Sequence, residues 1–469
     1  MTKRKGAGRL KWILLLLVLC GGAWALYGAT LRGPNVAIEI TSDRPAIGPG
    51  TRVHASFAAE RWGLGRIRLV FEQGSCRKVL AEQTLSRPSA FDLLAAASAG
   101  ARAELSAEVG RQSVECLAEG SATILAEAER MSGPLRGEKW SRISVELPVR
   151  LRPPSIQVLS TAHYVTQGGS GAVAFHVSET AVRSGVRVGE RDIPSYPHPR
   201  GGTGHRVVLF GVPWDMDSAK EIRLFAEDDA GNRAEAAFIF GRQFRRRAPR
   251  KDVIRLPDSF LERVVPSIEG QTPRLDTSGS LIERYLRINQ QLRVANRRTV
   301  AELAEKSAGE ALWDGPFLQL PNSARRAGFA ERRTYLYRGR VVDHQTHLGL
   351  DLASVAHADV PAPNRGRVLF AGYLGIYGNV VILDHGLGLL SLSAHLSRVA
   401  VSVGDLVDKG QTVGASGATG LAGGDHLHLG LFAGGIAVSP MEWLDPRWIR
   451  NRIEPVLAHG EARETATGK

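Results

Sequence analysis

The sequence predicts a multidomain, mainly β chain: an N-terminal transmembrane helix, two β-rich domains, a helical segment and a C-terminal β domain. Three observations predict this architecture. An uncharged run extends from Trp12 to Leu31, apolar residues alternate with polar ones over most of the remaining chain, and helical spacing is concentrated near residues 281–295. A length of 469 residues is enough for about three domains, and 43% hydrophobic residues allow them to bury cores.

The expected boundaries follow breaks in these patterns. They are 1–33 for a cytoplasmic basic tip and transmembrane anchor, 34–152 for a β-rich domain, 153–241 for a second β domain, 242–256 for a basic linker, 257–317 for the helical segment, 318–450 for the C-terminal domain and 451–469 for a flexible tail.

The N-terminus predicts the location of the protein. Five basic residues precede the uncharged run, which is long enough to cross a bilayer as a helix at about 1.5 Å per residue. Because positive flanks stay in the cytoplasm, we expect a single-pass protein of the cytoplasmic membrane, with its bulk in the periplasm or otherwise outside the cytoplasm. A cleaved signal peptide is the alternative, since Ala23, Ala25 and Ala29 are small, but the run is longer than a usual signal core. Cys20 follows a leucine too bulky for lipoprotein cleavage, so we interpret it as a buried apolar residue.

The formal net charge of +13 favours anionic partners such as nucleic acid, acidic lipid headgroups or acidic wall polymers. No basic helix, zinc-finger spacing or aromatic RNA-binding motif is found in the sequence, so no nucleic acid partner is expected. Two cysteines follow the N-terminal run, Cys76 and Cys116, and an isolated pair of this kind outside the cytoplasm often forms a disulfide. Two separate buried thiols are the alternative.

The two β domains are predicted from residues that alternate with a period of two. In the first, Ile67, Leu69 and Phe71 alternate with Arg66, Arg68 and Val70, whereas the Ala-rich segment from Ser89 to Val109 predicts a helix. In the second, the strand ending near Ala226 is followed by a hairpin turn at 228–232 and a strand at Ala236–Phe240. This turn resembles one common in bacterial immunoglobulin-like domains, which implies β sandwiches.

Basic and helical segments follow. The run from Arg242 to Lys251 is interpreted as a solvated linker, with a clamp on an anionic polymer or lipid as the alternative. Three pairs match a helix-capping box: Ser259 with Glu262, Ser280 with Glu283, and Thr299 with Glu302. An apolar stripe at helical spacing is predicted to pack against a neighbouring domain. Its members are Leu281, Tyr285, Ile288, Leu292 and Ala295.

Three strand-like segments near the C-terminus carry histidines. Since alternate side chains of a strand share a face, His347 and Asp351 point one way and Leu348, Leu350 and Leu352 the other, with Gly349 leaving room between the first two. His426 and His428 likewise share a face opposite Leu427, Leu429 and Leu431. In the third segment, Ser391, Ser393 and His395 are predicted to face away from Leu390, Leu392 and Ala394.

If these strands are neighbours in one sheet, the histidines and the Asp351 carboxylate converge. Zinc binds imidazole and carboxylate, and catalytic zinc sites keep three protein ligands and an open position. The other nearby histidines lack such support, and a loop or structural role is predicted for His344, His357 and His385.

These motifs resemble peptidase family M23, also called the LytM or lysostaphin type. The pattern is H-x-x-x-D, then A-H-L, then H-L-H, supplied here by His347 with Asp351, by Ala394-His395-Leu396 and by His426-Leu427-His428. Glycine turns of the family's kind accompany them, for example Gly375-Ile376-Tyr377-Gly378-Asn379. The resemblance covers about a quarter of the chain.

The resemblance implies an antiparallel β-sheet domain with one Zn²⁺ per chain, held by His347, Asp351 and His428, and with His395 and His426 as catalytic histidines. It implies a peptidoglycan endopeptidase. The uncharged N-terminal run is expected to attach this enzyme to the inner membrane, and the identity of any regulatory protein partner stays unknown. Two positions depart from the family: Ser393 stands where tyrosine is common and Leu429 where phenylalanine is common. Since Ser393 is predicted to share a face with His395, it is expected to alter the substrate groove.

Two other functions stay open. One is a non-catalytic scaffold or activator of another wall hydrolase, against which the retained ligands argue. The other is a peptidase for proteins, because a metal site does not define its substrate. The helices between Ser259 and Lys306 are expected either to pack beside the catalytic groove and limit entry or to support the domain from behind.

Overall fold

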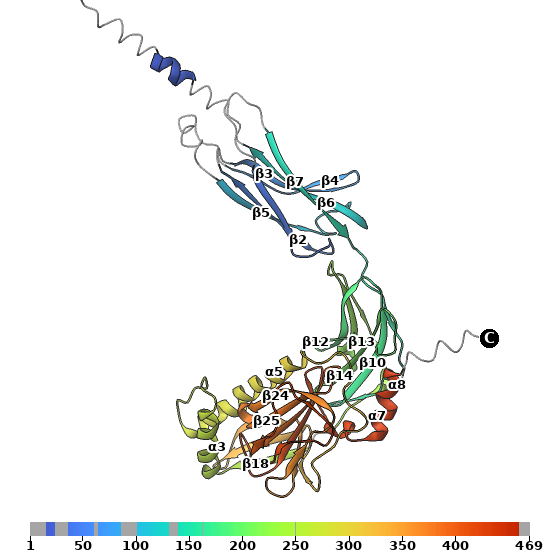
Figure 1. The fold of residues 1–469 in the computed structure, drawn as a ribbon, viewed down its shortest axis with the longest axis vertical. Coiled ribbons are helices and arrows are strands. Elements are labelled where there is room, and N and C mark those ends of the chain that lie inside the picture. The colour runs from blue at the N-terminus through green and yellow to red at the C-terminus, as the bar shows by residue number, and fades with distance from the viewer. Residues whose placement is uncertain are drawn as a thin grey trace, which may run out of the picture. The chain divides into compact units, whose positions relative to one another are not determined.

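The computed structural model describes residues 16–23, 36–60, 64–85, 101–130, 139–161, 163–248 and 250–458. The chain divides into two compact units (Figure 1). One consists of Met1–Pro153 with Glu227–Arg233, and the other of Pro154–Ala226 with Ala234–Lys469. The predicted mainly β, multidomain architecture with one helical segment before the C-terminal β domain is confirmed.

Among the described residues, none of the helices has the length and apolarity needed to span a bilayer. The N-terminal helix is described over residues 16–23, and the rest of the expected span lies outside the described residues, as does the basic tip. Cys20 is exposed on this helix, so the protein itself does not bury it, and its burial in a bilayer stays a prediction. The neighbouring Leu16, Leu17, Val18 and Leu19 are exposed as well, because the described helix has no core to pack against.

The first unit is a β sandwich. One sheet has the order β1 (Ala37–Ser42), β2 (Thr51–Ala59), β5 (Ala101–Val109), and the other β4 (Cys76–Thr84), β3 (Leu64–Gln73), β6 (Gly120–Arg130), β7 (Lys139–Val149). Ile67, Leu69 and Phe71 are fully buried between the sheets, as their alternation predicts.

The helix predicted for Ser89 to Val109 is wrong over its second half. Residues 101–109 form β5, which pairs antiparallel with β2 along its whole length, while residues 89–100 lie outside the described residues. Alanine favours helices, but here Ala103, Leu105 and Ala107 alternate with charged and polar residues and pack against the core. Tertiary burial of this period-two pattern outweighs the helix propensity of alanine.

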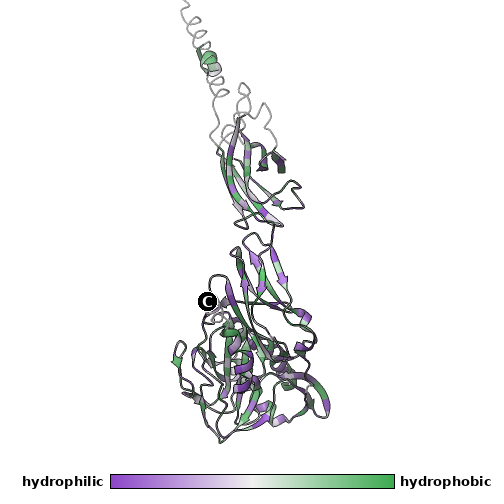
Figure 2. Ribbon diagram, turned by 90° about the vertical axis from the view of Figure 1, so that its right-hand side faces the viewer, coloured by the Kyte–Doolittle hydropathy of each residue, from purple (hydrophilic) through white to green (hydrophobic). Residues whose placement is uncertain are grey.

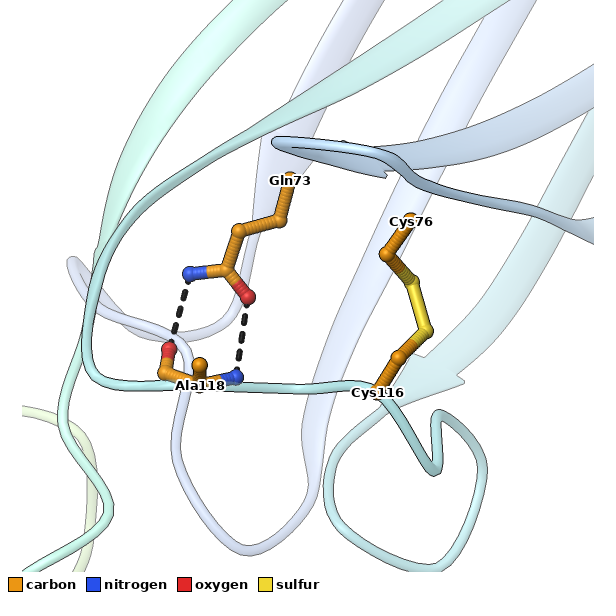
Figure 3. The surroundings of a disulfide bond; sticks show 4 residues. All are labelled: Gln73, Cys76, Cys116 and Ala118. Carbon is orange, nitrogen blue, oxygen red and sulfur yellow. Dashed lines mark hydrogen bonds between the residues drawn. A yellow bond between two sulfur atoms is a disulfide. The ribbon is translucent and has the colours of Figure 1, made fainter.

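Cys76 and Cys116 form a disulfide between the start of β4 and the loop before β6 (Figure 3). Gln73 reinforces this attachment, because its side-chain amide donates to the Ala118 carbonyl oxygen at 2.8 Å and accepts from the Ala118 amide at 2.9 Å. A covalent and a polar link therefore both fix this loop to the β3–β4 hairpin.

The second unit begins with another β sandwich. Its sheets have the orders β13 (Tyr196–Pro197), β14 (His205–Gly211), β10 (Ser170–Val177), β8 (Ile156–Val158), and β12 (Arg191–Pro194), β11 (Ala181–Val188), β15 (Ile222–Asp228), β16 (Arg233–Ala236). Hydrophobic and hydrophilic residues alternate along many of these strands (Figure 2). The hairpin turn at 228–232 is confirmed by the bond from the Asp228 amide to the Asn232 carbonyl, but the strand after it ends at Ala236 instead of beginning there.

Part of the expected basic linker is sheet. β17 (Phe244–Arg245) pairs with β9 (Val165–Thr166), and β18 (Lys251–Leu256) pairs in parallel with β20 (Glu331–Tyr337), which in turn pairs with β21 (Arg340–His347). Strand β18 therefore attaches the segment before the helices directly to the C-terminal domain.

The helical segment comprises α3 (Asp258–Gly270), α4 (Leu281–Arg287), a π-helical turn at Ile288–Leu292 and α5 (Arg293–Ala304). Of the three predicted capping boxes, only Ser280 with Glu283 starts a helix. Ser259 lies inside α3, and Thr299 lies inside α5, where its hydroxyl donates to the Ala295 carbonyl. A matching residue pair is insufficient when the chain is already helical upstream of it.

The predicted apolar stripe is largely confirmed, since Tyr285, Ile288 and Leu292 are buried. Ala295, however, is exposed, and Asn296 takes the inward position. Three turns of about 3.6 residues place residue 296, rather than 295, above Tyr285. The Asn296 side chain accepts a hydrogen bond from the Ile376 amide at 2.9 Å and so ties α5 to the loop Gly375–Tyr377.

The C-terminal domain is built on an antiparallel eight-stranded sheet. Its order is β19 (Ala324–Ala327), β22 (Leu350–Ala353), β30 (Leu427–Ala433), β26 (Leu389–Leu396), β25 (Asn379–Asp384), β24 (Gly366–Tyr373), β28 (Leu406–Val407), with β31 (Ile436–Val438) paired to β30. One face packs against the helical segment through residues such as Ile382, Leu390 and Phe432.

The other face of this sheet is covered by a small sheet and by C-terminal helices. The small sheet has the order β23 (Asp359–Pro361), β29 (Thr412–Ala415), β27 (Arg398–Val399), and the helices are α6 (Pro440–Trp443), α7 (Pro446–Arg452) and α8 (Glu454–Leu457). Residues 451–457, expected to belong to a flexible tail, are thus largely helical, and Ile453 is fully buried. Residues 459–469 lie outside the described residues.

Candidate metal centre and active-site cleft

Strands β21, β22 and β30 bring three donor atoms together. His347 Nε2 and Asp351 Oδ1 are 2.9 Å apart, His428 Nδ1 and Asp351 Oδ1 are 2.9 Å apart, and the two nitrogens are 3.0 Å apart. Asp351 lies directly opposite His428 in the β22–β30 pair, so the two side chains share a face. Leu350, Leu352, Leu427 and Leu429 point to the other face, which confirms the predicted alternation.

The ligand orientation is fixed by neighbouring backbone groups. His347 Nδ1 donates to the Gly328 carbonyl oxygen at 2.9 Å, which leaves Nε2 with its lone pair aimed at the cluster. A Cβ added to Gly349 would lie 2.5 Å from the His428 ring and 2.9 Å from the Leu429 carbonyl oxygen, so only glycine fits there. The predicted role of Gly349 in leaving room is confirmed.

This cluster fits a metal ion because its three donor atoms can each present a lone pair that carries no proton. A neutral imidazole that donates through one nitrogen accepts through the other, and an ionised carboxylate only accepts. Burial alone would raise the pKa of Asp351, but His347 and His428 outweigh it and hold the pKa of this carboxyl well below its usual range. Burial lowers the pKa of His428 to about 4.

Three electron-rich atoms so close together are stabilised by a shared cation. Zinc bonds of about 2.0–2.2 Å in a tetrahedral arrangement separate ligand atoms by roughly 3.3–3.6 Å. The donor atoms lie 2.9–3.0 Å apart, so they would move apart by roughly 0.3–0.7 Å to hold the ion. Among the described residues, this is the group of histidine and acidic side chains whose donor atoms converge closely enough for a metal ion.

A cationic side chain contacts the same carboxylate from outside. Arg333 Nη2, on β20, lies 3.1 Å from Asp351 Oδ2, the oxygen that does not face the histidines. Sequence reasoning missed this residue, although β20 and β21 form a hairpin whose short turn, Arg338-Gly339, contains the glycine typical of such turns. The arginine fixes the orientation of the carboxylate and leaves Oδ1 free to serve as a metal ligand.

His395 reaches the site by a route that alternation did not predict. In β26, Leu390, Leu392 and Ala394 lie on the face of His428, whereas Ser391 and Ser393 lie on the opposite, fully buried face. Regular alternation would therefore turn His395 away from the metal ligands.

A β-bulge turns the His395 side chain toward the face that carries His428. The register between β25 and β26 shifts by one residue between the pairs Asn379–Leu396 and Val381–Ser393, and His395 adopts φ +62°. The prediction that Ser393 shares a face with His395 and alters the groove is wrong for this reason. A non-glycine residue in the left-handed region is strained by about 1 kcal/mol or more, and such strain is found preferentially at functional sites.

His395 and His426 both present Nε2 to the metal centre. His395 Nδ1 donates to the Thr419 carbonyl at 2.8 Å, and His426 Nδ1 donates to the Gly424 carbonyl at 2.8 Å. The two rings lie 4.8 Å apart, and His426 Nε2 is 3.6 Å from Asp351 Oδ1. Burial, with His426 and His428 nearby, holds the pKa of His395 well below its usual value, so its imidazole is neutral.

A cleft of about 690 Å³ opens over these groups. Its walls come from the sheet and also from β18, α3, α4 and α5, through residues such as Leu256, Phe260, Tyr285 and Arg293. The helical segment therefore lies beside the groove, the first of the two expected arrangements, because its apolar stripe covers the sheet face that carries His428. That it limits substrate entry stays a prediction. Four arginines line the cleft, namely Arg255, Arg263, Arg293 and Arg333.

The remaining histidines lie away from the cluster, as predicted. His344 is exposed beside Thr334, and His357 is exposed beside Asp425 and Ser397. His385 is fully buried; its Nδ1 donates to the Arg365 carbonyl and its Nε2 accepts from the Ser391 hydroxyl. Burial lowers the pKa of His385 to about 4, which is consistent with a neutral structural residue.

Known proteins similar to this chain share mainly this C-terminal part. Peptidoglycan DD-endopeptidase ShyA of Vibrio cholerae serotype O1 is 27% identical over 203 residues, which are 43% of this chain and 44% of that protein. DD-carboxypeptidase/endopeptidase Mpg of Neisseria meningitidis serogroup B is 36% identical over 107 residues, 22% of this chain and 25% of that protein. The chain thus spans less than half the length of these relatives.

The catalytic domain of lysostaphin from Staphylococcus simulans is similar in structure over 28% of this chain and 98% of that domain, with 28% identity and a TM-score of 0.25. Residues 345–440 match the sequence profile of Peptidase family M23, and all five residues of the H-x-x-x-D, A-H-L and H-L-H motifs fall in that stretch and in one cleft. The C-terminal domain of this chain, over residues 345–440, is therefore a member of peptidase family M23.

Proposed function

We propose that this chain is a zinc endopeptidase that hydrolyses peptide cross-links of peptidoglycan during cell-wall remodelling. The observation that carries the proposal is the convergence of His347, Asp351 and His428 in one cleft with the Nε2 atoms of His395 and His426. The names of the relatives ShyA and Mpg support peptidoglycan as the substrate.

The residues divide into ligands and catalytic groups. His347, Asp351 and His428 would hold one Zn²⁺, which supplies a Lewis acid for the scissile carbonyl and for a water molecule. His395, neutral and buried, would accept the proton of that water through Nε2. His426, whose Nδ1–H is bonded to the Gly424 carbonyl, would donate a hydrogen bond to the oxyanion through Nε2 only as the imidazolium. The exchange of these two roles between the histidines is equally compatible with their positions.

The cleft suits a peptide that carries free carboxylates. Its four arginines face a single acidic side chain, Asp351, among the lining residues that the structure describes. Arginine binds carboxylates through two parallel hydrogen bonds, so acidic groups flanking the scissile bond would be oriented in the groove. A peptide cross-link without free carboxylates would form no ion pairs with these arginines.

The test is digestion of purified peptidoglycan by the zinc-loaded protein, followed by identification of the new peptide ends. We expect dimeric, cross-linked fragments to disappear and monomeric fragments with a new amino terminus to accumulate, because hydrolysis of a cross-link separates two stem peptides. Binding of the wall without new ends would instead support the scaffold or activator function. Cleavage of unfolded protein but not of peptidoglycan would support a general peptidase.

We also propose a single-pass location in the cytoplasmic membrane, supported by the five basic residues before the uncharged run. A periplasmic reporter enzyme fused after Lys251 should be active, and a reporter that works only in the cytoplasm should be silent at the same position. The N-terminus of the mature protein should be that of the full chain. A mature protein that starts near Tyr27 or Gly28 would indicate a cleaved signal peptide.

A further inference from the structure

A second hollow, of about 420 Å³, lies between the basic segment and the C-terminal domain. Five arginines line it: Arg246, Arg247, Arg250, Arg325 and Arg332. Three come from the basic run, one from β19 and one from β20. The fold therefore gathers charges from three separate segments in one place, which a merely solvated linker would not require.

These charges are only partly neutralised by carboxylates. Glu442, which does not line the hollow, interacts electrostatically with Arg247. Asp217 is the acidic side chain among the described residues that line the hollow, and it lies 3.9 Å from Arg246 with both side chains largely exposed. Within the described part of the chain, Arg250, Arg325 and Arg332 form no ion pair with a carboxylate. Arg325 contacts the Met441 sulfur at 3.4 Å, and Arg332 lies over the Trp214 ring at 5.7 Å.

Five guanidinium groups around one small hollow repel one another, and an anion placed among them removes that repulsion. Guanidinium groups bind phosphate well, because each offers two parallel N–H donors to two oxygens. A phosphate has enough oxygens to accept such paired hydrogen bonds from several arginines. The half-buried Trp214 gives the hollow one apolar wall.

This hollow is distinct from the catalytic cleft. No lining residue is common to the two cavities. The turn around Gly328, whose carbonyl orients His347, separates them. A ligand in the arginine hollow would therefore not contact the metal ligands.

We propose that the arginine hollow binds a phosphate group of an envelope component, either a phosphomonoester or the phosphodiester of a lipid headgroup, and thereby holds the C-terminal domain at an anionic surface. Neither source is a peptide, so this site acts in addition to the cleft. Arg246, Arg247 and Arg250 of the basic run then form one wall of a binding site.

The experiment is calorimetric titration of the full-length protein with inorganic phosphate and, separately, with glycerophosphoglycerol, the deacylated headgroup of phosphatidylglycerol. Each titration is run on zinc-loaded and on metal-stripped protein, so that phosphate bound to the metal is recognised by its loss on stripping. The variant Arg250→Gln/Arg332→Gln should bind about tenfold more weakly or worse, since a hydrogen bond to a charged group contributes about 1.5–3 kcal/mol.

A matched control removes the same charge elsewhere. Arg298→Gln/Arg340→Gln alters two exposed arginines that line neither cavity and should leave the affinity unchanged. Arg325→Gln provides a second test if the double variant folds poorly by circular dichroism. Binding of phosphate alone identifies a phosphomonoester, and binding of both probes identifies a headgroup-like diester. Absence of metal-independent binding, or equal weakening in the control, overturns the proposal.

Discussion

Replacing His428 with alanine should remove most of the zinc from the purified protein. His428 Nδ1 lies within 3.0 Å of the donor atoms of both other ligands, and two ligands rarely hold zinc tightly. We expect the affinity for zinc to fall by on the order of 100-fold or more, and hydrolysis of peptidoglycan to be lost with the metal. The measurement is metal content by mass spectrometry after dialysis against a weak chelator.

The matched control is His344→Ala. His344 lies on β21 with His347, but it is exposed and its ring contacts Thr334 rather than the metal site. The zinc content of the His344→Ala protein should therefore equal that of the unaltered protein. Circular dichroism separates loss of ligand from loss of fold. Full zinc occupancy in a folded His428→Ala protein would mean that the ligand set has been assigned wrongly.

How far this site follows from the sequence depends on how regular each strand is. Asp351 and His428 belong to paired strands that keep a period of two, so alternation alone places them on the face opposite Leu350 and Leu429. His347 ends β21 in a separate sheet, and the break before β22 is not encoded in the alternation. His395 does not follow the alternation, because a bulge with a left-handed residue reverses its direction. No glycine marks that bulge in the sequence. Ser391 and Ser393 are therefore also predicted to lie on the face of His395, which is wrong.

The walls of the cleft are harder still to predict. Leu256, Phe260 and Tyr285 reach the groove only because β18 pairs in parallel with β20, a contact that local periodicity does not encode. The same helices bury Ile382, Leu390 and Leu392. A fragment that begins near Leu318 would expose this core, so a change in its activity would report lost packing as well as a widened groove.

Replacing His395 or His426 with alanine should leave zinc bound and lower hydrolysis by roughly 100-fold or more, the scale of general acid–base contributions. Both Nε2 atoms point into the metal centre, and neither atom belongs to the group of three that converges on one point. The two variants therefore differ from His428→Ala in retaining metal. His357→Ala, an exposed histidine paired with Asp425, is the control and should keep full activity.

Zinc content and kcat should both be measured on the same protein sample, because only their combination separates a ligand from a catalytic group. A catalytic role requires normal zinc with a reduced kcat, and because His395 is held at φ +62°, its alanine variant should also be checked for thermal stability. If either variant loses its zinc while the fold survives, that histidine is a ligand rather than a catalyst. If either retains both zinc and activity, the proton must be transferred by another group in the cleft, and the role assigned to that histidine is wrong.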